Sequence, residues 1–118
     1  MKKLLLLLAL LAPGLSQAAD CFVSSYGYIG TAKDGKTMQV PVEPPLFSEK
    51  VTFTTTSVAS TAFPAGTSLV GIVCNNSVTY FAVGSSPTAT TSSHYLAADQ
   101  WFYFAVSSNG LQVAFRTP

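Results

Sequence analysis

The chain has 118 residues, of which 48% are hydrophobic and only 9% are charged. Six lysine and arginine residues stand against five aspartate and glutamate residues, and the basic residues are scattered. The sequence therefore has no basic patch that could neutralise nucleic-acid phosphates, and we expect no nucleic-acid partner. Its length predicts a single domain.

The first 18 residues are predicted to be a secretory signal peptide. Lys2-Lys3 precede an apolar run at residues 4–12, and Ser16-Gln17-Ala18 places small side chains where a signal peptidase reads. The apolar run is shorter than the roughly 20 residues of a membrane-spanning helix. Cleavage after Ala18 is favoured, with Ala19 as the alternative site. We expect residues 19–118 to form one exported β domain, periplasmic or extracellular, with no membrane anchor.

Cys21 and Cys74 are the two cysteines of the chain. In an exported protein two cysteines are expected to form a disulfide, which would stabilise the fold by roughly 2–4 kcal/mol. Two free buried thiols are the alternative. A lipoprotein cleavage site before Cys21 is disfavoured because Asp20 precedes it. Two cysteines and the single distant histidine, His94, lack zinc-site spacing, so we expect no metal.

The first half of the expected mature chain shows period-two alternation between turn signals and no convincing helix. A first strand is predicted at residues 22–28. Lys33-Asp34-Gly35-Lys36 then suits a tight hairpin with a type I′ turn. The alternating stretch at residues 38–42 contains Pro41, which indicates an edge strand or a strand end. A longer, threonine-rich strand starts at Lys50.

Five further strands are predicted in the second half, at residues 69–74, 78–83, 94–96, 101–106 and 111–116. Asn75-Asn76 is expected to close a hairpin between the first two of these, and Asn109-Gly110 a hairpin between the last two. Short strands joined by hairpins predict an all-β fold, a small antiparallel β-sandwich or jelly-roll-like barrel of seven or eight strands.

The stretch WFYFAV, residues 101–106, packs four aromatic rings into six residues. Strand alternation places Phe102, Phe104 and Val106 on one all-apolar face, so we expect this strand at the centre of the fold. Trp101 and Tyr103 share the other face, and the polar atom of each side chain favours a position in which one end of the ring contacts water.

The surface most suited to contact another molecule is therefore expected around Trp101 and Tyr103. His94-Tyr95 and the polar loop at residues 85–94 are further candidates for it. A sugar or base platform would also need carboxylates or amides nearby, and Asp99-Gln100 supplies one such pair.

Motifs of catalysis are missing from the sequence. It has no Gly-x-Ser-x-Gly nucleophile motif, no spacing that suggests a Cys–His pair, and no glycine-rich phosphate loop. Glu43 and Glu49 flank a proline loop and Asp34 lies in a predicted turn, so no pair of carboxylates stands out for glycoside hydrolysis. We expect a protein that is not an enzyme and has no cofactor.

Residues 51–115 resemble small virion-associated, minor structural proteins of tailed bacteriophages. The features that carry the resemblance are STAFPAGT at residues 60–67, FAVGSSPTAT at residues 81–90, Tyr95-Leu96, Tyr103-Phe104 and GLQVAF at residues 110–115. The resemblance implies a small all-β module, a minor head or tail component, and brings no catalytic residues.

Two features of the chain, its leader and Cys21, depart from that phage pattern. Either a phage-type module serves in the cell envelope, or the phage has an exported component. We therefore expect a non-enzymatic exported β module of phage or prophage type, virion-associated or envelope-associated, that contacts protein partners or its own copies. The alternative is a small secreted or periplasmic ligand-binding or inhibitory domain that uses Trp101, Tyr103 and the loop at 85–94. A small hydrolase ranks below both.

Overall fold

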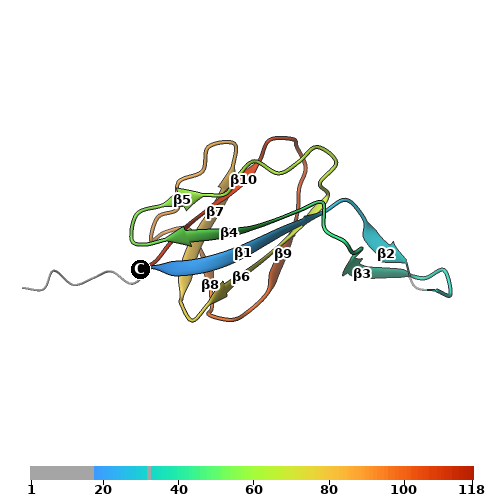
Figure 1. Cartoon of the computed structure of the whole chain (residues 1–118), viewed down its shortest axis with the longest axis horizontal. Helices are drawn as coiled ribbons and strands as arrows, with labels where there is room; N and C mark the ends of the chain where they lie inside the picture. Colours follow the sequence, from blue (N-terminus) through green and yellow to red (C-terminus); the bar gives the residue numbers. More distant parts are fainter. Residues whose placement is uncertain (1–17, 32) are drawn as a thin grey trace, which may run out of the picture.

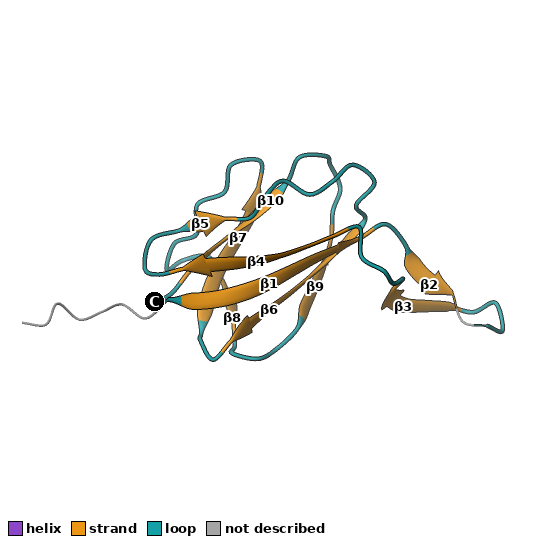
Figure 2. Cartoon of the chain, in the orientation of Figure 1, coloured by secondary structure: helices purple, strands orange, loops and turns teal. Residues whose placement is uncertain are grey.

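The computed structural model describes residues 18–31 and 33–118, and in these residues the chain is all-β. The predicted signal peptide lies outside the described residues except for Ala18. The described residues form ten strands, whose arrangement is shown in Figures 1 and 2. They are β1 (Ala19–Tyr26), β2 (Ile29–Thr31), β3 (Thr37–Pro41), β4 (Phe47–Phe53), β5 (Val58–Ala59), β6 (Leu69–Asn75), β7 (Thr79–Gly84), β8 (His94–Leu96), β9 (Phe102–Ala105) and β10 (Gln112–Arg116).

Eight of these strands form two four-stranded antiparallel sheets, which confirms the predicted sandwich. Sheet 1 has the order β4-β1-β6-β9 and sheet 2 the order β5-β10-β7-β8. From β4 onward the chain passes from one sheet to the other at each connection, apart from the β7–β8 hairpin. Counted from β4, this is the strand order of a jelly roll, and β1 occupies the position that the last strand of a jelly roll usually takes.

The core lies between the two sheets, where every second residue of the central strands points. Along β1, Cys21 and Val23 are fully buried, while Phe22 between them is exposed on the outer face. Phe53 of β4 and Phe115 of β10 stack across the sandwich with ring centroids 5.5 Å apart. Each buried phenylalanine stabilises the fold by roughly 1.5–3 kcal/mol.

A disulfide joins Cys21 and Cys74, as predicted. The two residues are directly opposite each other in the β1–β6 ladder, and both are fully buried. Because they are 53 residues apart in the chain, the chain-entropy model assigns this cross-link about 4 kcal/mol of stability.

The β2–β3 hairpin leaves the sandwich between β1 and β4 and projects from one end as an arm (Figure 1). The predicted hairpin is confirmed, with Pro41 at the end of β3 opposite Ile29. The predicted type I′ turn is wrong. Gly35 has a φ of 82°, but Asp34 is not among the described non-glycine residues with positive φ, and type I′ needs positive φ at both central residues. The Asp34 carboxylate instead accepts a hydrogen bond from the Lys36 backbone N–H.

The two other predicted hairpins are also wrong. β6 and β7 belong to different sheets, as do β9 and β10. The turn residues do adopt left-handed backbone conformations, with φ of 54° at Asn76 and 76° at Gly110. These turns reverse the chain, but each carries it across the sandwich, because both sheets must bury an apolar face against the other.

Candidate contact surfaces

The stretch WFYFAV forms an edge of the fold, so its predicted place at the centre is wrong. β9 is the last strand of sheet 1, and β6 is its one ladder partner among the described residues. The predicted alternation holds, because Phe102 and Phe104 pair with the inward-facing Ile72 and Val70. At this edge, however, Phe102 remains 43% exposed.

Trp101 and Tyr103 lie together on the outer face of sheet 1, as their alternation predicts. Their rings are nearly parallel, at 11°, with centroids 5.8 Å apart. They are 53% and 45% exposed, respectively. We call this pair the aromatic platform.

Gly71 of β6 makes the platform possible. It is the ladder partner of Tyr103, and a Cβ atom at this position would lie 2.6 Å from Tyr103 Cε1. The absence of a side chain lets the tyrosine ring lie against the backbone of the neighbouring strand. Gly71 was not among the predicted site residues, although an isolated glycine inside a strand is a signal of close approach.

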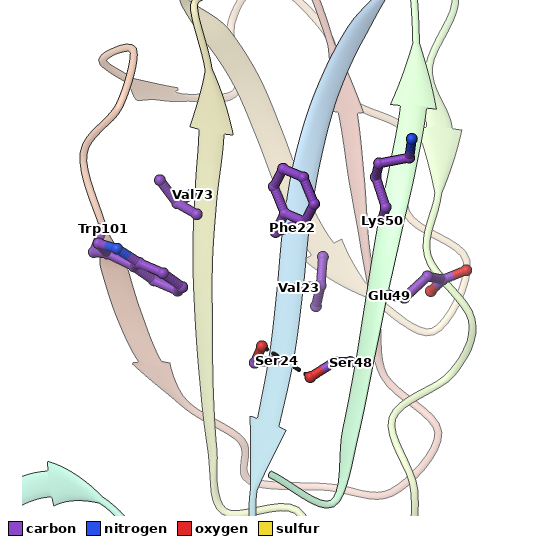
Figure 3. Close-up of a pocket in the computed structure, with 8 residues that line it drawn as sticks. All are labelled: Phe22, Val23, Ser24, Ser48, Glu49, Lys50, Val73 and Trp101. Atoms are coloured by element: carbon purple, nitrogen blue, oxygen red, sulfur yellow. Dashed lines mark hydrogen bonds between the residues drawn. The ribbon is translucent and has the colours of Figure 1, made fainter. Parts of the chain in front are cut away.

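The platform continues into a hollow of about 580 Å³ on the same face of sheet 1. Figure 3 shows the rings of Trp101 and Phe22 on either side of β6, which carries Val73. The hydroxyl groups of Ser24 and Ser48 are hydrogen-bonded at 3.1 Å in the same hollow. Phe22 and Val73 were not predicted as site residues, because the pairing of β1 with β6 cannot be read from local sequence patterns.

Tyr26 lies on the same strand face as Phe22 but is 5% exposed. Its hydroxyl group donates a hydrogen bond to Glu43 Oε1 at 3.2 Å. Burial raises the pKa of Tyr26 above its usual value, and the Glu43 carboxylate raises it further. The phenol is therefore neutral at physiological pH, and its contact with Glu43 ties the base of the arm to sheet 1.

A second hollow, of about 370 Å³, opens between the two sheets beside β9. His94 lines it and stacks on Phe81 with centroids 5.2 Å apart. Phe81 in turn contacts Phe102, at a centroid distance of 5.4 Å. His94 is exposed and is the first residue of β8, which confirms the strand predicted at residues 94–96.

Tyr95 and the loop at residues 85–93 belong to sheet 2. Tyr95 packs edge-on against its ladder partner Tyr80, with centroids 6.2 Å apart. The loop is fastened beside β5, because the Ala89 N–H donates to Ser57 Oγ at 2.9 Å. The predicted candidates are thus divided among three places: Trp101 and Tyr103 on the outer face of sheet 1, His94 at the inter-sheet hollow, and Tyr95 with the loop on sheet 2.

Ligands for a metal are not gathered in the part of the chain that the structure describes, where no three His, Cys, Asp or Glu side chains come together. The same residues contain no helix that could cross a membrane. Comparison of the chain with protein-family models, with curated proteins and with solved structures gave no match. The described residues define an all-β sandwich with one buried disulfide and an exposed aromatic platform.

Proposed function

We propose that this chain is a non-enzymatic, exported β module of phage or prophage type that binds protein as a virion-associated or envelope-associated component. The observation that carries the proposal is the aromatic platform of Trp101 and Tyr103. Tyr103 lies in β9 and Trp101 immediately precedes that strand, so sheet 1 carries the stacked pair with both rings exposed.

Exposed aromatic side chains of this kind favour a contact role. Tryptophan and tyrosine dominate the binding energy of protein interfaces. Contiguous exposed apolar patches with a polar rim mark interaction sites. Here Trp101, Tyr103, Phe22 and Val73 form the apolar part, and the hydroxyl groups of Ser24 and Ser48 lie beside it.

The placement of the carboxylates favours a role without catalysis. Each of the five acidic side chains has a polar partner that fixes local structure. The pairs are Asp20 with Thr52, Asp34 with Lys36, Glu43 with Tyr26, Glu49 with Thr61, and Asp99 with Asn76.

Two features support export. The buried Cys21–Cys74 disulfide is compatible with an oxidising compartment, and residues 1–18 have the pattern of a signal peptide. The phage or prophage origin rests on the resemblance of residues 51–115.

A second candidate function is glycan binding on the same face. Sugar rings pack on flat aromatic surfaces, and the nearly parallel Trp101 and Tyr103 rings next to Ser24 and Ser48 provide such a surface with hydroxyl groups at hand. Titration of the purified protein against a panel of soluble glycans, followed by Trp101 fluorescence, separates this candidate from protein binding.

The proposal is tested by fractionation of cells and particles that contain the tagged protein. The double variant Trp101→Ser/Tyr103→Ser should lose its association with the virion or envelope fraction. Tyr95→Ser, which removes an exposed aromatic side chain from sheet 2, is the matched control and should keep it. Equal retention of the double variant and the control would contradict the proposed role of the platform.

A further inference from the structure

The arm and its base expose several apolar side chains. Tyr28 is 77% exposed at its base, and a two-stranded hairpin by itself is marginally stable at best. A Cβ on Gly30 would meet Val40 and Val42, so these two valines lie over the glycine on one face of the arm. Alternation places Tyr28 on that same face. Ile29 and, just beyond the arm, Leu46 are also exposed.

The same chain carries a second apolar surface that the arm does not cover. The platform and Phe22 lie on the outer face of sheet 1, whereas the arm projects away from the end of the sandwich (Figure 1). One chain thus has an apolar projection and an apolar receiving face, joined at the arm's base by the hydrogen bond between Tyr26 and Glu43.

We propose that a second copy of this chain covers both surfaces, in a two-fold dimer in which each arm lies on the platform of its partner. This inference rests on the proposed function, because it assigns the protein that the platform binds. The two-fold arrangement makes the contact self-complementary, so arm meets platform twice in one interface.

The exposed area decides between a reciprocal and a one-way contact. Ile29 points to the opposite face of the arm. Scaled by their exposed fractions, Tyr28, Val40, Val42 and Leu46 offer about 400 Å², and Phe22, Trp101 and Tyr103 offer about 300 Å². A reciprocal dimer therefore buries about 700 Å² of apolar surface on each partner, close to the roughly 800 Å² of a standard stable interface. A one-way contact would bury half as much.

Charge does not oppose this pairing. The described residues carry four basic side chains, Lys33, Lys36, Lys50 and Arg116, against five acidic ones. A net charge so close to zero gives two copies little mutual repulsion.

The test is the mass of residues 19–118, with the disulfide intact, measured by sedimentation over a wide concentration range. We expect two copies. Trp101→Ser and, separately, the arm variant Tyr28→Ser/Val42→Ser should each weaken the dimer about 30-fold or more, the loss typical of interface hot spots. The control Tyr95→Ser should leave the dimer unchanged. Near-ultraviolet circular dichroism and the thermal midpoint of each variant show that it remains folded.

A mixing experiment tests the reciprocity. A mixture of the platform variant and the arm variant retains one intact arm and one intact platform that face each other. It should therefore form a heterodimer that is tighter than either variant's homodimer and weaker than the wild-type dimer. A monomer at all concentrations, an assembly of three or more copies, or a mixture without heterodimer overturns the inference. If the chain is monomeric and Trp101→Ser/Tyr103→Ser still loses its virion or envelope association, the dimer is refuted and the proposed function stands.

Discussion

Gly71→Ala adds one methyl group beneath the Tyr103 ring, and its effect can be worked out from the structure. Gly71 is buried in β6 and is not among the described glycines with positive φ, so its backbone accepts alanine. By itself the change should stabilise the fold by about 0.4–1 kcal/mol through the entropy of the unfolded chain. The new Cβ, however, would lie 2.6 Å from Cε1 and 3.0 Å from Cδ1 of Tyr103, so the ring must lift from the sheet.

The displaced ring loses its contact with β6 and its stacking on Trp101. Overpacking costs about 1–3 kcal/mol, and a lost aromatic pair about 0.5–1.5 kcal/mol. After the entropic gain is subtracted, we therefore expect Gly71→Ala to lower the free energy of unfolding by about 2 kcal/mol, within a range of about 0.5–4 kcal/mol. Urea unfolding followed by the fluorescence of Trp101, the single tryptophan, measures this at one fixed protein concentration.

A double-mutant cycle isolates the cause. With Tyr103→Ala already in place the clash is absent, so Gly71→Ala should become neutral or stabilising. Equal destabilisation by Gly71→Ala in the two backgrounds would refute the reasoning, because it would mean that the Tyr103 ring does not lie on Gly71.

Phe104→Ala should lower the free energy of unfolding by about 3 kcal/mol, since Phe104 packs on the core, and Trp101→Ala should lower it by less than half as much in dilute monomer. Denaturant midpoints, compared at unchanged slope, measure both losses, and a larger loss for Trp101→Ala would contradict the assignment of strand faces. Reduction of the Cys21–Cys74 disulfide should lower the free energy of unfolding by about 4 kcal/mol. Alkylation without a reductant should leave the intact mass unchanged, and two adducts would disprove the bond. Because the pKa of Tyr26 is raised in the fold, the unfolded chain ionises first, and stability should fall as pH rises from the usual tyrosine pKa, about 10, toward the folded pKa. Tyr26→Phe should reduce that alkaline loss, and identical pH profiles would contradict it.

Local patterns in the sequence predicted the faces of the strands but not their neighbours. The alternation of Phe102 and Tyr103 indicated correctly which side chain points inward. It could not show that β9 is an edge strand, because the place of a strand in a sheet depends on pairing with residues far away in the chain. The density of aromatic residues in WFYFAV suggested a strand at the centre of the fold. In the structure these aromatic side chains instead form the exposed platform on one face and line the inter-sheet hollow on the other.

Turn chemistry had the same limit. Asn76 and Gly110 adopt the left-handed conformations that their residue types favour, yet neither turn joins strands of one sheet. The disulfide was predictable for a simpler reason, because the expected mature chain offers Cys21 and Cys74 no other cysteine. The packing of the Tyr103 ring on Gly71 was not predictable, since these residues are remote in sequence and meet only through the β6–β9 ladder.

The most direct test of the central claim, that the outer face of sheet 1 is the contact surface, is site-specific photo-crosslinking in cells that produce the protein. A benzophenone amino acid is placed at Trp101 and, as the matched control, at Tyr95 on the opposite sheet. The platform position should give a discrete covalent adduct with a protein, which is a second copy of the chain if the arm exchange is correct, and the control should give none. Adducts from Tyr95 without adducts from Trp101 would contradict the claim.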